Sequence, residues 1–175
     1  MNHEVDIFPV AGGQEDIDVL TEILVEVVAN GGSVSFMHPL SPERAGRFWR
    51  DSLAAADRGE RVVFGARSAG RLVGTVTLIL DCQQNQPHRA EIAKLMTRLS
   101  HRGRGVARAL MLEAERTAVE GGRTLLTLDT AAEDGAAALY EGLGYERAGV
   151  IPDYAYKPHG GLSATIVLYK KLARA

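Results

Sequence analysis

Arg102-Gly103-Arg104-Gly105-Val106-Ala107 lies between a predicted strand and a predicted helix, and this unit decides the fold. The glycines allow consecutive backbone N–H groups to face one point without a side chain in the way. The helix that follows adds its own unsatisfied N–H groups and the positive end of its dipole. The stretch therefore predicts a binding site for a phosphate or pyrophosphate group.

Three other interpretations of this turn can be compared with its residues. A tight surface turn with solvated arginines stays open, because short glycine motifs occur by chance. A Walker A loop needs Gly-Lys followed by Ser or Thr, and Gly105-Val106-Ala107 has neither. A dinucleotide fingerprint needs a third glycine where Arg108 stands, and it belongs to the first βαβ unit rather than past the middle of the chain. The turn alone thus indicates an anion site without naming its ligand.

The chain of 175 residues fits one domain, residues 1–175, with a mixed α/β fold. Alternating and helical apolar patterns separate the elements. Strands are predicted over residues 5–10, 61–67, 72–80, 89–99, 124–129, 145–151 and 164–169. Helices are predicted over residues 16–30, 42–56, 104–120 and 130–143. The last helix is expected to start at Thr130, because Thr130-Ala131-Ala132-Glu133 matches a capping box.

Two motifs carry a resemblance to a known family. Arg102-x-x-Gly105-x-Ala107 matches the Gln/Arg-x-x-Gly-x-Gly/Ala signature of the GNAT acetyltransferases, and residues 138–145, Ala-Leu-Tyr-Glu-Gly-Leu-Gly-Tyr, resemble that family's second motif. The resemblance implies a mostly antiparallel sheet of about six to seven strands flanked by four helices, with splayed strands forming an acetyl-CoA cleft. Residues 31–37, residues 89–91 together with 94–96, and residues 125–130 are further similar to the tabtoxin-resistance acetyltransferases. Leu99 and Glu133 depart from the proline and asparagine common in the family.

The same resemblance implies the contacts to acetyl-CoA. The pyrophosphate is expected on the turn formed by Arg102, Gly103, Arg104, Gly105, Val106 and Ala107. The backbone of Leu95, Met96 and Thr97 is expected to hold the acetyl-pantetheine arm along a splayed strand. Backbone donors near the thioester oxygen would stabilise the charge that acyl transfer develops.

Three side chains are candidates for catalysis. The resemblance implies Glu91 and Asp129 as a pair of general bases or ligands of the substrate ammonium. Tyr140 is the candidate acid for the departing thiolate, because a phenol stays protonated at neutral pH. Each has a structural alternative: Glu91 as a solvated strand residue, Asp129 as support for the helix start at Thr130, and Tyr140 as a core residue.

The predicted reaction is acetyl transfer to the primary amine of a small molecule by direct attack in a ternary complex. Three loops, residues 31–38, 81–89 and 152–160, are expected to surround the acceptor. The resemblance suggests an amino-acid-like toxin or antibiotic. An endogenous amino acid, a polyamine, a protein amine and a non-catalytic acetyl-CoA sensor remain alternatives. Cys82 is not expected to act as a nucleophile, because the sequence shows no histidine partner for it.

Composition argues against other classes of function. The 20 basic and 22 acidic residues give a formal charge of −2, without the excess of a nucleic-acid binder. No run approaches the roughly 20 apolar residues that cross a bilayer. The five histidines are scattered and there is a single cysteine, so neither a metal site nor a disulfide is expected. These features fit a cytoplasmic enzyme, and a homodimer stays open.

Overall fold

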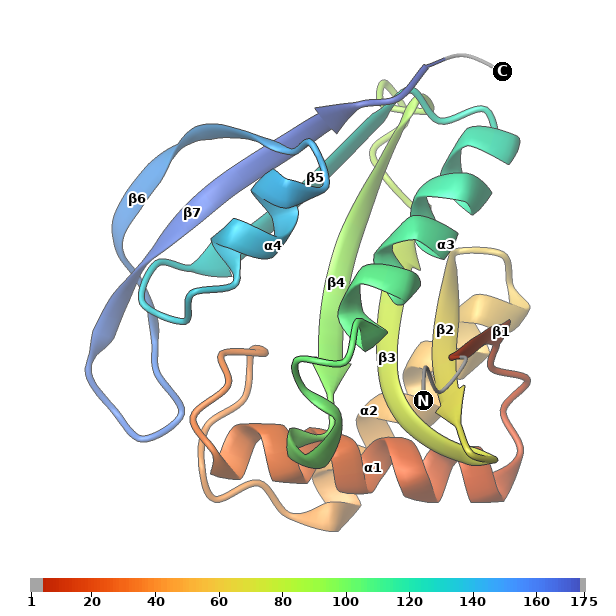
Figure 1. Ribbon diagram of the computed structural model, residues 1–175, viewed down its shortest axis with the longest axis vertical. Coiled ribbons are helices and arrows are strands. Elements are labelled where there is room, and N and C mark those ends of the chain that lie inside the picture. Colours follow the sequence, from red (N-terminus) through yellow and green to blue (C-terminus); the bar gives the residue numbers. More distant parts are fainter. Residues whose placement is uncertain (1–4, 174–175) are drawn as a thin grey trace.

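A seven-stranded sheet runs through the computed structural model, which describes residues 5–173 (Figure 1). The strand order is β1-β2-β3-β4-β5-β7-β6, and every neighbouring pair is antiparallel except β4 and β5. The strands are β1 (Asp6–Pro9), β2 (Arg61–Ser68), β3 (Arg71–Ile79), β4 (Arg89–Thr97), β5 (Leu125–Ala131), β6 (Glu146–Tyr156) and β7 (Leu162–Lys171). The predicted mixed, mostly antiparallel sheet is confirmed.

Helices cover both faces of this sheet. They are α1 (Gln14–Ala29), α2 (Pro42–Asp57), α3 (Val106–Glu120) and α4 (Ala137–Gly142), with a short 3-10 turn at Leu99–His101. The start of α2 follows the sequence prediction: the Ser41 Oγ accepts a hydrogen bond from the backbone N–H of Arg44 at 3.3 Å, and Pro42 opens the helix.

Each face has its own apolar core. Core 1 joins the sheet to α3 and α4 and includes Leu110, Met111, Leu126, Leu128 and Leu168. Core 2 joins the other face to α1 and α2 and includes Leu20, Leu24, Trp49, Val63 and Met96. Core 1 draws residues from both halves of the sheet, whereas core 2 has none from β5, β6 or β7.

The parallel pair β4 and β5 separates soon after it begins. Its pairing covers only three residues of each strand, Arg89–Glu91 with Leu125–Thr127. Beyond this point β5 stays paired with β7 along its whole length, while β4 stays with β3. Figure 1 shows the two strands diverging toward α1. The predicted splay is therefore present.

The predicted helix start at Thr130 is wrong. Thr130 and Ala131 continue β5, opposite Ile166 and Thr165 of β7, and the N–H of Ala132 still bonds the carbonyl of Ala164 at 2.9 Å. This ladder satisfies the backbone groups that a capping box would have used, so α4 begins only at Ala137. The Glu133 carboxylate instead pairs with the ammonium of Lys157 at 2.6 Å.

Candidate active site

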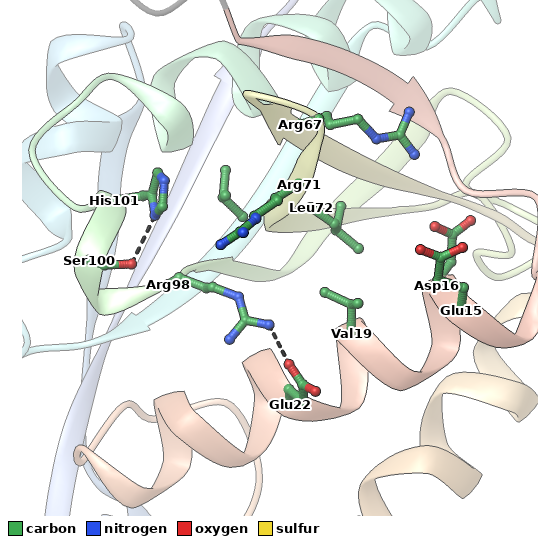
Figure 2. A pocket seen from close by; sticks show the side chains of 12 residues that line it. Glu15, Asp16, Val19, Glu22, Arg67, Arg71, Leu72, Arg98, Ser100 and His101 are labelled. Atoms are coloured by element: carbon green, nitrogen blue, oxygen red, sulfur yellow. Dashed lines mark hydrogen bonds and ion pairs between the residues drawn. The ribbon is translucent and has the colours of Figure 1, made fainter.

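Arg98 and Leu99, which precede the glycine turn, form hydrogen bonds and ion pairs with α1. The guanidinium of Arg98 contacts the carboxylate of Glu22 at 2.6 Å (Figure 2) and that of Glu26 at 3.1 Å. The other oxygen of Glu26 accepts a hydrogen bond from the N–H of Leu99 at 2.8 Å. Because one carboxylate binds both a side chain and a backbone group, the end of β4 is held in a defined position.

The turn itself presents unused donors. Gly103 and Gly105 have φ of 71° and 81°, in the left-handed region, and no atom lies within 4 Å of a Cβ built on either. Backbone conformation rather than crowding thus requires glycine there. Within residues 5–173, no backbone or side-chain acceptor takes a hydrogen bond from the N–H groups of residues 103–108. These groups and the amino end of α3 fit a pyrophosphate.

Three arginines lie within the turn or in the first turn of α3. Arg102, Arg104 and Arg108 are exposed, and none makes an ion pair within the described part of the chain. Their charges are therefore available to a ligand at the turn.

A cavity of about 580 Å³ lies beside the turn, between α1, the β2–β3 hairpin and residues 98–101. Figure 2 shows Arg71, Arg98 and His101 on one side of it and acidic side chains of α1 on the other. Neither the predicted carboxylates nor Tyr140 lines this cavity. It is thus a neighbour of the turn and not the place where the predicted catalytic groups meet.

Glu91 and Asp129 share one face of the sheet. Glu91 is opposite Thr127 in the last residue pair before the splay, and Asp129 lies two residues further along β5. Paired residues of a sheet point to the same side, and side chains alternate along a strand. Since the intervening Leu128 and the neighbouring Ala90 belong to core 1, the two carboxylates face the α1/α2 side.

The side chains of Glu91 and Asp129 both remain accessible to solvent. Glu91 has 41% of its side chain exposed and contacts Arg89 at 3.4 Å, while Arg89 also donates to the Thr127 hydroxyl at 2.7 Å. Asp129 is exposed and accepts a hydrogen bond from the Thr165 hydroxyl at 2.8 Å. The alternative in which Asp129 supports a helix start is wrong, because the strand continues past it.

Tyr140 lies on the opposite face, in core 1. Its side chain is buried, and its ring packs edge-on against Tyr145 with 6.0 Å between centroids. Burial first, and then the charge of Asp129, raise the pKa of Tyr140 to about 12. Within residues 5–173 its hydroxyl makes no hydrogen bond. The ring therefore packs as a core residue, while the hydroxyl stays protonated and free to donate.

The predicted arm-binding segment lies just beyond the splay. Met96 and Thr97 pair with Thr75 and Gly74 of β3, so one edge of this part of β4 is occupied. The edge toward β5 has no strand partner from residue 92 onward. The backbone of Leu95, Met96 and Thr97 thus lies beside the gap that the resemblance assigns to the pantetheine arm.

Residues 29–145 match the family model of the acetyltransferase (GNAT) family. The chain belongs to this family. Its members' reaction makes it an acetyl-CoA-dependent N-acetyltransferase.

Solved structures of similar fold come from several acetyltransferases. One is the ribosomal-protein-alanine N-acetyltransferase from Brucella melitensis, with 21% identity, a TM-score of 0.79 and coverage of 95% of this chain and 99% of that one. Another is yncA from Salmonella typhimurium with its cofactor acetyl-CoA, with 16% identity, a TM-score of 0.79 and coverage of 98% and 95%. A putative phosphinothricin N-acetyltransferase has 17% identity, a TM-score of 0.77 and coverage of 98% and 100%. At these identities the likeness establishes the fold alone.

Lys94, to which the sequence assigned no role, lies in the region of Glu91 and Asp129. A one-residue bulge opposite Val76 gives Lys94 a φ of 53°. Its ammonium donates to the Ser35 hydroxyl at 2.9 Å and lies 5.8 Å from the ring centroid of Phe48. Burial lowers the pKa of Lys94, and the nearby charges of Asp129 and Glu91 oppose that shift. A bulge of this kind leaves no periodic signal in the sequence.

Two of the three predicted acceptor loops meet in the structure. The N–H of His38 bonds the carbonyl of Pro158 at 2.9 Å, and the rings of His38 and His159 lie 4.5 Å apart. Part of the predicted third loop is strand, because β6 continues to Tyr156. Residues 81–89 lie at the other end of the sheet, where the His88 carbonyl accepts from Thr124 at 2.9 Å, so they do not join these two loops.

Among residues 5–173, no group of three or more histidine, cysteine, aspartate or glutamate side chains could hold a metal ion. In the same range, no helix has the length and apolarity needed to cross a membrane.

Proposed function

We propose that this enzyme transfers the acetyl group of acetyl-CoA to the primary amine of a small molecule by direct attack in a ternary complex. The observation that carries the proposal is the placement of three polar groups around the splay. Glu91 and Asp129 face one side of the sheet and Tyr140 lies on the other, with the gap between β4 and β5 separating them. We assign the activity to one domain spanning residues 1–175 and to the cytoplasm.

The chain would hold acetyl-CoA at two places. The turn from Arg102 to Ala107 supplies free N–H groups, a helix dipole and arginine charges to the pyrophosphate. The free edge of Leu95, Met96 and Thr97 supplies backbone hydrogen bonds to the arm. When bound, acetyl-CoA provides an acetyl group already activated as a thioester.

The acceptor side needs a neutral amine. A primary alkyl ammonium has a pKa of about 10, so the site must take a proton from it before attack. Glu91 and Asp129 both offer carboxylate oxygens that can hold the ammonium and accept this proton, directly or through water. In this proposal both carboxylates bind the ammonium, and either of them can accept its proton.

The leaving side needs a proton donor. Tyr140 has a free hydroxyl and a pKa raised to about 12, so it is protonated across the physiological range. In the proposal this hydroxyl donates its proton to the departing sulfur atom, and the proton that the nitrogen loses on becoming an amide replaces it, directly or through water. Its buried ring keeps the hydroxyl in place.

The proposed acceptor is an amino-acid-like toxin or antibiotic, as the resemblance to the tabtoxin-resistance acetyltransferases suggests. The contact between residues 31–38 and the β6–β7 turn supports a small acceptor, because it closes one side of the region beside Lys94. An endogenous amino acid, a polyamine and a protein amine remain competing acceptors.

The test is thiol release from acetyl-CoA across a panel of small amines. The wild-type enzyme should turn over at least one of them, and Glu91→Gln, Asp129→Asn and Tyr140→Phe should each lower kcat by about 100-fold. Unchanged rates in all three variants would remove the catalytic assignment. Tight acetyl-CoA binding in a calorimeter without thiol release from any amine would favour a non-catalytic sensor instead.

A further inference from the structure

Lys94 is a half-buried ammonium without an ion-pair partner among residues 5–173. Its only hydrogen bond within residues 5–173 goes to the neutral hydroxyl of Ser35, and no carboxylate there lies within 4 Å of its nitrogen. An ammonium carries three N–H donors, so two remain for a ligand. Partial burial of an unpaired charge carries a free-energy cost, and an anion on a bound ligand would offset this cost.

The backbone around this ammonium is held in unfavourable conformations. Lys94 has a φ of 53° and Ser35 a φ of 72°, and neither is glycine. Their side chains form a hydrogen bond that joins the β4 bulge to the loop after α1. Non-glycine residues in the left-handed region cost free energy and concentrate at functional sites.

The charges near Lys94 are arranged in a complementary way. Glu91 and Asp129 lie close enough for their charges to act on the lysine, and both face the same side of the sheet. The rings of Phe48 and Phe36, 5.3 Å apart and edge to face, provide an apolar wall beside it. A ligand complementary to these surroundings carries an ammonium group, a carboxylate group and an apolar side chain.

We infer that Lys94 forms the subsite for a carboxylate on the acceptor, so that the acceptor is a free amino acid rather than a polyamine or a protein amine. The ammonium of the acceptor is held by Glu91 and Asp129, and its carboxylate receives the two free N–H groups of Lys94. This inference rests on the proposed function, since it concerns the acceptor of the same reaction.

The experiment compares the common L-amino acids with their carboxamides in the thiol-release assay, using the full-length enzyme. The wild type should prefer the acid over the amide, and Lys94→Met should lower the ratio of their kcat/KM values by about 10- to 100-fold, the size of a charged hydrogen bond. The loss should fall mainly on KM. Lys94→Arg should restore part of the ratio, because it keeps the charge.

A matched control is Lys171→Met, an exposed lysine opposite Leu125 at the closed end of the splay, which should keep the wild-type ratio. Glycine, β-alanine and γ-aminobutyrate then measure the preferred spacing between amine and carboxylate. Equal losses on acids and amides in Lys94→Met, or a wild type that accepts amides, polyamines or peptide amines as well as acids, would overturn the inference.

A binding measurement separates this inference from the proposed reaction. The same acids and amides are titrated by calorimetry into the protein saturated with coenzyme A, which cannot donate an acetyl group. A preference for acids that disappears in Lys94→Met supports the subsite even if no amine is turned over. Absence of amino-acid binding together with turnover of another amine would sink the subsite and leave the acetyltransfer proposal standing.

Discussion

Gly105→Ala tests the requirement for a left-handed residue at the start of α3. Gly105 has φ 81° and ψ 1°, and an added Cβ would meet no atom within 4 Å. The cost is therefore conformational, about 1–2 kcal/mol for an L-residue in this region. If the turn keeps its shape, this energy is lost from the free energy of unfolding. If the turn relaxes, the same energy must be recovered when the ligand binds.

The two losses should consequently sum to about 1–2 kcal/mol, or a factor of about 5–30 in the equilibrium constants. Urea unfolding measures the first, and calorimetric titration with coenzyme A measures the second. Gly13→Ala is the matched control: Gly13 also caps a helix, with φ −61° and ψ 149°, which alanine adopts freely. Wild-type stability together with wild-type affinity in Gly105→Ala would refute the reasoning.

Three further predictions concern single side chains. Because the pKa of Tyr140 is about 12, its phenol stays protonated and can donate at lower pH. Ionisation of Tyr140 should therefore not lower kcat up to a pH of about 11. A fall in kcat below a pH of about 11 that disappears in Tyr140→Phe would contradict this prediction. Lys170→Met should lower the free energy of unfolding by about 3 kcal/mol, because it leaves the Glu115 carboxylate of α3, which is only 11% exposed, without its cation. Arg116→Met on the surface of the same helix should lower it by less than about 1 kcal/mol, and denaturant titration measures both values. Arg98→Met should weaken coenzyme A binding about 5-fold by releasing the start of the turn, a loss that Arg58→Met, in an exposed ion pair, should not reproduce in calorimetry.

The sheet and the phosphate turn could be predicted because they depend on local patterns. Apolar periodicity located the seven strands and four helices, and the pair Gly103 and Gly105 marked a strand-to-helix turn with adjacent arginines. The helix predicted from Thr130 was wrong for a non-local reason. Thr130 and Ala131 form backbone hydrogen bonds with β7, more than thirty residues away in the chain, instead of starting a helix at the capping motif.

The acceptor side was harder to predict. Glu91 and Asp129 could be singled out through a family resemblance, yet their common face depends on the register of β4 with β5. Lys94 enters the same region only because a bulge rotates it there, and bulges arise from tertiary packing rather than from residue type. Its partner Ser35 comes from a loop without periodicity.

The short pairing of β4 with β5 affects how a change in the β1–β4 half of the sheet influences the β5–β7 half. The strand ladder that joins β1–β4 to β5–β7 covers three residue pairs, and core 1 draws residues from both halves of the sheet, whereas core 2 does not cross the gap. A coenzyme arm lying along residues 95–97 would act as a removable eighth strand. Binding of the arm would slow amide hydrogen exchange on both sides of the gap at once. Occupancy of the acetyl-CoA site would thereby change the local stability around the residues that bind the amine.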